Sequence, residues 1–377
     1  MNTDFFIEML DIESTSGRER AFADFLAERM AGPGRRVETF EVETMAQDCP
    51  EGCGIPVNLM VSWGEPKVVF CTHLDTVPPY IAPSVEVMED GDMKISGRGS
   101  CDAKGQIFAM WEACLELERR GCTDFALLLL AGEETGSFGA KAFSAMPLRA
   151  VTTGDWVVIV GEPTDNCMTS ASKGTKSFEV TFKGEAFHSG YPQYGRSAVE
   201  MFNDFVNALR SIVFPKDEIL GDTTWNIGRL SSDNPQNILS ERLSCRVYFR
   251  TTFESDEMVC NVMKNMAGPD AKLRFGRRRV QDGSDIVAKE VAPWQKYMSV
   301  KAFGGDTPTV YQTLEGFPTK PVAFGSDAPQ LKCFDRKILC GPGSILVAHR
   351  SEEHIMLSDL KAAVASYIRM YTCLMGN

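Results

Sequence analysis

The sequence lacks several features that define whole classes of protein. Basic residues are outnumbered, with 39 lysines and arginines against 51 aspartates and glutamates, so the net charge is −12. Because phosphate binding requires a basic surface, this balance predicts that the protein has no nucleic-acid partner. No apolar run approaches the roughly 20 residues that cross a bilayer, and we therefore expect no membrane association.

Signals of secretion are also missing. The first residues, MNTDFFIEML, are acidic and contain neither the basic stretch nor the cleavage site of a signal peptide. The 12 cysteines include no CxxC pair, and in such a chain they are expected to be reduced and mostly buried. These features predict a cytoplasmic protein.

The chain is long enough for two domains, and its pattern changes near Lys173–Gly174. Before that point short apolar runs alternate with helical patterns, as in a mostly parallel sheet covered by helices. The same α/β pattern returns later and ends in a helix that we expect Ser358 to cap. We predict a discontinuous α/β domain, residues 1–172 and 290–377, that carries an inserted domain, residues 173–289.

Local patterns predict the elements of the inserted domain. Their order is strand, helix, strand, strand, helix, strand, which is that of a ferredoxin-like α+β module. The expected strands are 177–183, 223–230, 238–251 and 272–278, and the expected helices are 198–212 and 256–266. Near the start of the chain, Ser16–Glu19 has the S-x-x-E spacing of a capping box ahead of a helix.

Histidine and acidic residues follow three short apolar runs, with one to three residues between the end of each run and the residue concerned. His73 and Asp75 come after VVFC, Glu133 and Glu134 after FALLLL, and Glu162 after WVVIV. Such runs are typical of buried parallel strands, whose carboxyl ends line the ligand crevice of an open sheet. Residues two apart on a strand share a face, so Asp75 can accept a hydrogen bond from a metal-binding imidazole of His73. We therefore expect metal ligands from three segments at one edge of the sheet.

Two further residues complete a set of two histidines and three carboxylates. They are Asp102, just before a helix and able to bridge two cations, and His349. Imidazole and carboxylate ligands without thiolate favour catalytic over structural zinc. Five ligands, one of them shared, suit two ions ~3.5–4 Å apart. Of the adjacent Glu133 and Glu134, one can bind metal while the other acts as a base. Each signal alone also fits an ordinary surface turn, but their order along the chain favours a metal centre.

Six segments, in this order, resemble the motif series of the co-catalytic di-zinc deacylase and carboxypeptidase family. They are THLDTVP (72–78), SGRGSCDAKG (96–105), AGEETGSFGA (131–140), VGEPT (160–164), FHSGYPQYGRSA (187–198) and GPGSILVAHRSEEHI (341–355). The family includes acetylornithine deacetylase, succinyl-diaminopimelate desuccinylase, aminoacylase and glutamate carboxypeptidase. The resemblance spans nearly the whole chain and includes the inserted domain, which is the lid of that family.

The resemblance implies a role for each residue of the metal centre. The implied ligands are His73 and Glu162 for one zinc, Glu134 and His349 for the other, and Asp102 for both. Glu133 matches the general base that takes a proton from a metal-bridged water, and Asp75 matches the carboxylate behind the ligand histidine. Cobalt or manganese can substitute for zinc in such sites. The peptide bond between Asp102 and Ala103 is expected to be cis.

In the inserted domain the resemblance implies three more site residues. His188 matches a histidine that reaches the active site of the partner subunit, and Arg250 matches an arginine that binds a substrate carboxylate. Asn237 matches the asparagine beside that arginine. The sequence departs from the family pattern nearby, where Leu230-Ser231-Ser232 replaces a glycine pair and Leu239 replaces a proline. A homodimer through the lid is also implied.

The function implied by the resemblance is zinc-dependent hydrolysis of the amide bond of N-acyl amino acids. Glutamate at position 162 is the form associated with the deacylases of the family. A metallo-exopeptidase, either a dipeptidase or a carboxypeptidase, with the same site is the first alternative. A family member that binds without turnover is the second. The expected partner is a small N-acyl amino acid or a dipeptide.

Overall fold

The computed structural model describes residues 1–47, 49–146, 156–281 and 284–376, and within 276–290 only the main chain. The chain forms two compact units. The first unit comprises Met1–Ser170, Val310–Val322 and Ser326–Asn377, and the second comprises Ala171–Thr309 and Ala323–Gly325.

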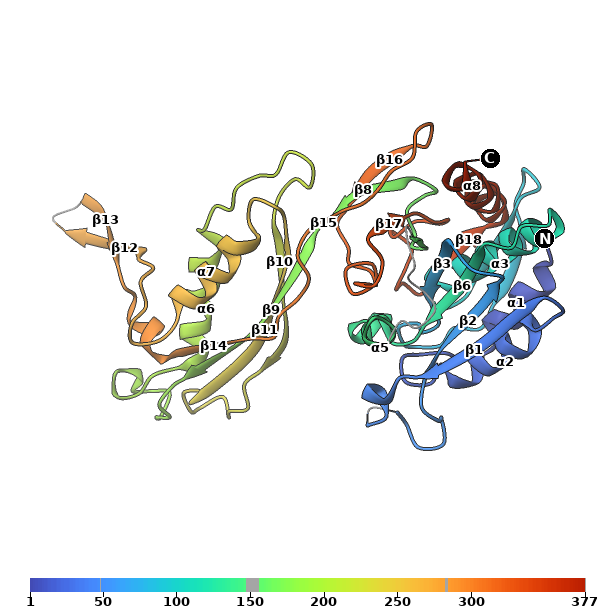
Figure 1. Ribbon diagram of the computed structural model, residues 1–377. Helices are drawn as coiled ribbons and strands as arrows, with labels where there is room; N and C mark the ends of the chain where they lie inside the picture. The colour runs from blue at the N-terminus through green and yellow to red at the C-terminus, as the bar shows by residue number, and fades with distance from the viewer. Residues whose placement is uncertain (48, 147–155, 282–283, 377) are drawn as a thin grey trace. The chain divides into compact units, whose positions relative to one another are not determined.

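The first unit is built on a six-stranded sheet in the order β1-β2-β6-β3-β7-β17 (Figure 1). Its strands are β1 (Arg35–Glu41), β2 (Val57–Trp63), β3 (Val68–His73), β6 (Phe125–Leu130), β7 (Val157–Val160) and β17 (Arg336–Leu339). The neighbours β6, β3, β7 and β17 are parallel, whereas β1 and β2 add antiparallel pairs at one side. Every residue of β2, β3, β6 and β7 is buried, as expected for strands covered on both faces. The predicted mostly parallel sheet is confirmed.

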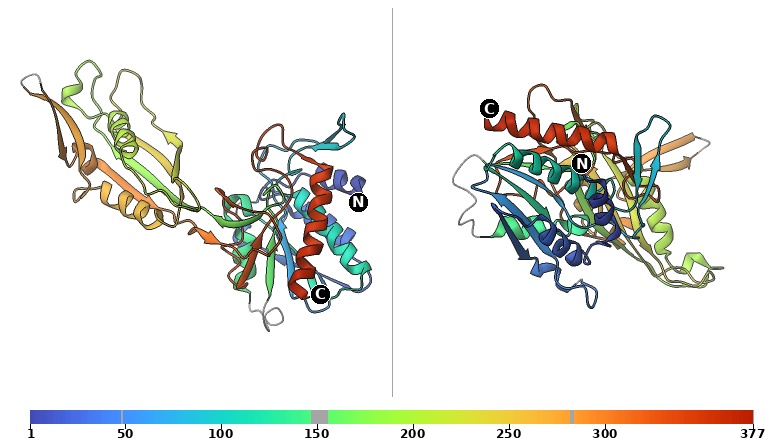
Figure 2. Two further views of the ribbon diagram at one scale, coloured as in Figure 1. Left: turned by 90° about the horizontal axis from the view of Figure 1, so that it is seen from above. Right: turned by 90° about the vertical axis from the view of Figure 1, so that its right-hand side faces the viewer.

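Helices cover this sheet on both faces. They are α1 (Thr3–Asp11), α2 (Arg20–Met30), α3 (Lys104–Arg119), α5 (Phe138–Ala145) and α8 (Leu357–Met375). The buried faces of α1, α2, α3 and α8 share one hydrophobic core with the sheet, and α3 and α8 run side by side (Figure 2). Helix α8 begins at Leu357, so Ser358 is not its cap, and the Ser358 hydroxyl instead donates to Asp92. No helix in the described ranges is long and apolar enough to cross a membrane.

Two small sheets accompany the large one. Their strands are β4 (Ser84–Val87), β5 (Met93–Ser96), β8 (Met168–Ser172), β15 (Thr309–Val310), β16 (Thr319–Val322) and β18 (His354–Met356). Strand β18 pairs with β5, and β5 pairs with β4. This pairing brings the segment after His349 against the segment before Asp102.

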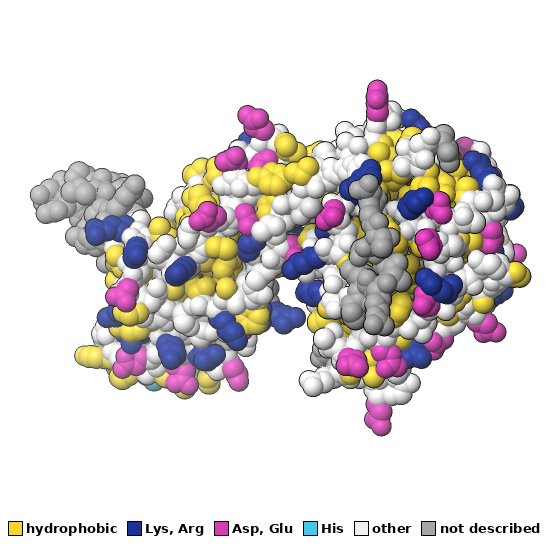
Figure 3. All heavy atoms as spheres, in the orientation of Figure 1, with side chains coloured by type: hydrophobic (Ala, Val, Ile, Leu, Met, Phe, Trp, Pro, Cys, Tyr) yellow, Lys and Arg dark blue, Asp and Glu magenta, His cyan; other side chains and the backbone are white. Residues whose placement is uncertain are grey.

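The second unit is an antiparallel sheet in the order β10-β11-β9-β14 with two helices. Its elements are β9 (Gly174–Lys183), α6 (Ala198–Arg210), β10 (Thr224–Ser231), β11 (Arg242–Thr251), α7 (Asp256–Met266) and β14 (Met298–Ala302). The order of strands and helices is the predicted ferredoxin-like one. Figure 3 shows acidic and basic side chains interspersed on the visible face of each unit.

The prediction that residues 272–278 form the last strand of this module was wrong. Strand β12 (Phe275–Gln281) pairs instead with β13 (Ser284–Glu290) in a separate hairpin. The fourth strand of the sheet is β14, which pairs with β9. The second unit therefore continues to Thr309, whereas the inserted domain was predicted to end at residue 289.

Candidate metal centre

The predicted ligands lie where the parallel strands of the large sheet end. His73 is the last residue of β3, and Glu162 comes two residues after β7. Glu133 and Glu134 follow β6 and open the short helix α4 (Glu133–Gly136). Gly132, just before this helix, has a φ of +68°, and a Cβ there would lie 2.6 Å from the sulfur of Met45, so the sharp turn requires glycine.

Asp102 lies between the two predicted histidine ligands. Its Oδ1 is 3.1 Å from Nε2 of His73, and its Oδ2 is 3.3 Å from Nε2 of His349. The peptide bond between Asp102 and Ala103 is cis, as predicted. One buried carboxylate thus presents a separate oxygen to each imidazole.

Each histidine also has a second carboxylate nearby. The ligand atoms of His73, Asp102 and Glu162 all lie within 4.8 Å of one another, and so do those of Asp102, Glu134 and His349. Oε1 of Glu134 is 3.0 Å from Nε2 of His349. Each of these two groups has one imidazole and two carboxylates, and Asp102 belongs to both. The structure thus brings the five predicted ligand residues together.

The electrostatics of the cluster fit bound cations. Burial raises the pKa of Glu134, and burial together with the charges of Asp102 and Glu133 raises the pKa of Glu162. Hydrogen bonds to Asp102 and Glu134 raise the pKa of His349 to about 10. Several carboxylates gathered in one buried volume are stabilised by a cation, which becomes the largest local charge. Oxygen and imidazole donors of this kind suit two divalent metal ions.

Glu133 adjoins both groups of ligands. Its carboxylate lies within 4.8 Å of the ligand atoms of His73 and Glu134. Burial raises the pKa of Glu133 well above its usual range, and the charges of Asp327 and Glu134 add to this effect. A carboxyl group with a raised pKa can both take up and return a proton near neutral pH.

The carboxylate of Asp75 holds the turn that carries the two glutamates. Its Oδ1 accepts a hydrogen bond from the N–H of Glu133 at 2.9 Å, and its Oδ2 accepts from the N–H of Glu134 at 3.2 Å and from the hydroxyl of Ser16 at 2.7 Å. Nδ1 of His73 is 2.9 Å from the backbone oxygen of Asp75 but 3.5 Å from its Oδ1. The main chain of Asp75 is thus the nearer partner of the imidazole, rather than the carboxylate that the sequence suggested.

The Ser16–Glu19 segment is not the predicted capping box. Helix α2 begins at Arg20 without a side-chain cap, and the hydroxyl of Ser16 binds Asp75 instead. Glu19 is fully buried. Burial and the nearby charge of Asp75 raise the pKa of Glu19 to about 8. Neither residue was predicted to be part of the site, because S-x-x-E spacing fits a helix start equally well.

Arg98 and Glu353 form a second pair near the site that was not predicted from the sequence. Both side chains are buried and form an ion pair next to Asp102. The only sequence signal was their position inside two of the quoted motif segments, 96–105 and 341–355.

The remaining predicted site residues lie in the second unit. His188 is exposed on the loop after β9, with its ring 5.9 Å from that of Tyr191. Asn237 is exposed, and its backbone carbonyl oxygen accepts a hydrogen bond from the N–H of the residue after His188. Arg250 is half-buried on β11, with its guanidinium carbon 5.0 Å from the ring centre of Tyr248. His188 and Asn237 are therefore neighbours within this unit.

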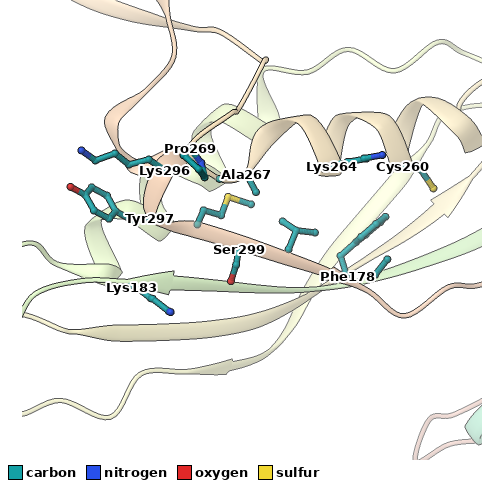
Figure 4. Close-up of a pocket in the computed structure, with 13 residues that line it drawn as sticks. Phe178, Lys183, Cys260, Lys264, Ala267, Pro269, Lys296, Tyr297 and Ser299 are labelled. Atoms are coloured by element: carbon teal, nitrogen blue, oxygen red, sulfur yellow. The ribbon is translucent and has the colours of Figure 1, made fainter.

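A cavity of about 680 Å³ also lies in the second unit, between α7 and β14 (Figure 4). Lys296 and Tyr297 lie at one end of it, and Phe178 and Cys260 lie toward the other. None of its lining residues is a predicted site residue, so this cavity is not part of the candidate metal centre.

The chain belongs to peptidase family M20/M25/M40, whose model matches residues 69–372. A probable carboxypeptidase of Aspergillus terreus is 32% identical over 387 residues, which cover 97% of this chain and 84% of the relative. Among solved structures, a tripeptidase from Staphylococcus aureus superposes with a TM-score of 0.73 at 18% identity, covering 98% of this chain and 96% of that one. A dinuclear metal-binding M20 peptidase from Bacillus subtilis gives 0.62 at 13% identity, covering 99% and 97%. The protein is a metallohydrolase that acts on amide bonds.

Proposed function

We propose that the protein uses two divalent metal ions, with zinc as the expected metal, to hydrolyse an amide bond in a small substrate that ends in a free carboxylate. The observation that carries this proposal is the position of Asp102, with one oxygen toward His73 and the other toward His349. Glu162 and Glu134 complete the two groups of ligands. When bound, the two cations would polarise the scissile carbonyl and lower the pKa of a water molecule.

Glu133 is the residue that moves the proton. The bond from its N–H to Asp75 fixes the start of α4, so the side chain is held beside the ligand groups. Its carboxylate takes the proton of the attacking water and returns it to the leaving amine. Its neighbour Glu134 faces His349 and serves as a ligand.

Arg250 supports the choice of a substrate with a free carboxylate. A guanidinium offers two parallel N–H donors to a carboxylate, and its half-buried position strengthens such a pair. The name of the Aspergillus terreus relative supports the C-terminal peptide bond of a short peptide as the target. Glu162, the residue type associated with deacylases, supports an N-acyl amino acid.

The test is a hydrolysis screen of the zinc-loaded protein. The substrates are N-acetyl amino acids, N-succinyl amino acids and dipeptides, each beside its C-terminal amide as a matched control. We expect turnover of at least one class of substrate with a free carboxylate. Activity on the matching amides should be at least roughly 10-fold lower, because the amides cannot form the ion pair. Turnover of none of the carboxylates, or equal turnover of the amides, contradicts the proposal.

We also propose a homodimer through the second unit, in which His188 serves the site of the partner copy. Large exposed apolar side chains lie on and near the His188 loop: Phe187 (40% exposed), Tyr191 (57%), Tyr194 (64%) and Ile238 (39%). Strand β10 is an edge of the sheet, and an edge strand can pair with its twin across a two-fold axis. A second copy is therefore the occupant that we propose for this surface.

A further inference from the structure

A buried ion pair joins the loops that carry two of the predicted ligands. The side chains of Arg98 and Glu353 are 3% and 1% exposed and pair through Nη1 and Oε2. Arg98 lies four residues before Asp102, and Glu353 lies four residues after His349. The proposed function gives this pair no role.

The carboxylate of Glu353 binds the main chain of the Asp102 loop. Its Oε1 accepts hydrogen bonds from the N–H groups of Gly99 at 3.0 Å, Cys101 at 3.1 Å and Asp102 at 3.1 Å. Hydrogen bonds to an ionised acceptor are roughly twice as strong as neutral ones. The backbone of Asp102 is thus attached directly to a charged group from the His349 loop.

The guanidinium of Arg98 binds two more segments. Its Nε donates to the carbonyl oxygen of Pro79 at 3.1 Å, and its Nη1 donates to that of Arg350 at 3.2 Å. Pro79 follows the segment 73–75, and Arg350 is the residue after His349. The ion pair therefore contacts the loop that follows His73 and the loops that carry Asp102 and His349.

We infer that Arg98 and Glu353 are positioning residues that fix the carboxylate of Asp102 between the two metal positions. This inference rests on the proposed metal centre. Asp102 must present one oxygen to each side, so a shift of its backbone disturbs both positions together. Loss of an outer group that orients a ligand typically lowers metal affinity ~10–100-fold. Loss of the pair should therefore weaken the binding of both metal ions, not of one alone.

Two variants and one control separate positioning from folding. Glu353→Gln keeps the size of the side chain but removes the charge that binds the three N–H groups and Arg98. The double variant Arg98→Met with Glu353→Met replaces the pair by apolar side chains of similar volume, a change that often preserves stability. Glu352→Gln is the matched control, because the adjacent Glu352 side chain is 70% exposed. Circular dichroism and thermal unfolding verify the fold of each variant.

The first readout is hydrogen exchange of the metal-free protein, which does not depend on metal binding. We expect peptides spanning residues 97–103 to exchange at least ~10-fold faster in both Glu353 variants and at the wild-type rate in Glu352→Gln. The second is zinc affinity, measured by competition with a chromophoric chelator, which should fall ~10–100-fold for both ions.

Each outcome decides between the inference and its alternatives. Unchanged exchange in folded Glu353→Gln overturns the inference, and so does faster exchange with wild-type zinc affinity, because the pair is then only structural. Weaker binding of one zinc ion alone also overturns the inference. A wild-type protein that binds no zinc overturns the proposed metal centre itself, and the inference with it, whereas zinc binding that ignores Glu353 overturns the inference alone.

Discussion

The carboxylate of Asp75 accepts a hydrogen bond of 2.9 Å from the backbone N–H of Glu133. His73 is the last residue of β3, and this bond joins the segment that follows it to the turn after β6. The same carboxylate accepts from the N–H of Glu134. One side chain therefore holds in place both the proposed base and a proposed ligand.

Replacing Asp75 by Asn should weaken metal binding. The amide nitrogen of Asn cannot accept a hydrogen bond, so at least one of the donors from Ser16, Glu133 and Glu134 loses its acceptor. We expect zinc affinity to fall ~10–100-fold in a chelator competition assay. Ser16→Ala leaves the acceptor intact and should cost less. Wild-type affinity in Asp75→Asn would show that the turn holds its shape without this carboxylate.

Replacing Glu19 by Gln should flatten the dependence of stability on pH. The pKa of Glu19 is raised from 4.5 to about 8 by burial and by Asp75. Between these values the unfolded chain has released the proton and the folded protein has kept it, so the free energy of unfolding falls as the pH rises through this window and levels off above it. Each pKa unit is worth ~1.4 kcal/mol, which makes the effect on the order of a few kcal/mol.

Denaturant unfolding measures this effect at pH values from about 5 to about 9, which cover most of the range between the two pKa values. The Glu19→Gln variant should gain stability relative to the wild type as the pH rises and should differ least at the acidic end. Glu28→Gln, an exposed position on the same helix α2, is the control and should follow the wild type. Parallel profiles for wild type and Glu19→Gln would mean that Glu19 ionises normally.

Replacing Arg250 by Ala should selectively impair substrates with a free carboxylate. A hydrogen bond between charged groups contributes ~1.5–3 kcal/mol, so kcat/KM should fall roughly 10- to 100-fold on carboxylates and much less on the matching amides. Arg246→Ala is the matched control, since Arg246 lies on the same strand and pairs with Glu179 at 3.6 Å. An equal loss on both substrate classes would assign Arg250 another role.

Mixing two inactive variants tests whether His188 acts on the partner copy. Dimers of His188→Ala and Glu133→Gln subunits should regain activity, because one of the two sites then has both groups intact. The recovery should approach a quarter of wild-type activity, because roughly half of the randomly mixed dimers are mixed and each has one intact site. No recovery after verified subunit exchange would place His188 in its own site or outside catalysis.

The buried strands, and the histidine and acidic residues just past their ends, were predictable because their signals are local. Short apolar runs bounded by polar residues mark buried parallel strands, and the residues directly after these strands share one edge of the sheet. His73, Glu162 and the adjacent pair Glu133 and Glu134 follow from that rule alone, whereas the choice of Glu134 as the ligand comes from the family resemblance. Asp102 and His349 needed the composition of the donor set as well.

The misses came from contacts between distant parts of the chain. The bond from Ser16 to Asp75 spans 59 residues, and the bond from Asp102 to Glu353 spans 251. The local sequence of Ser16–Glu19 fits a helix cap and a segment that contacts the site equally well. In the second unit, β14 pairs with β9 across more than a hundred residues, and the hairpin of β12 and β13 occupies the place where the last strand was expected.

Turnover by the zinc-loaded Glu133→Gln variant tests the proposed hydrolysis most directly. Glu133 is beside the ligands but is not needed to hold them, so the variant should bind as much zinc as the wild type. Loss of a general base lowers kcat by ~10²–10⁴-fold, and that is the expected result on the best substrate of the screen. A metal-loaded variant with a kcat close to the wild-type value would contradict the assignment of Glu133 and the proposed reaction.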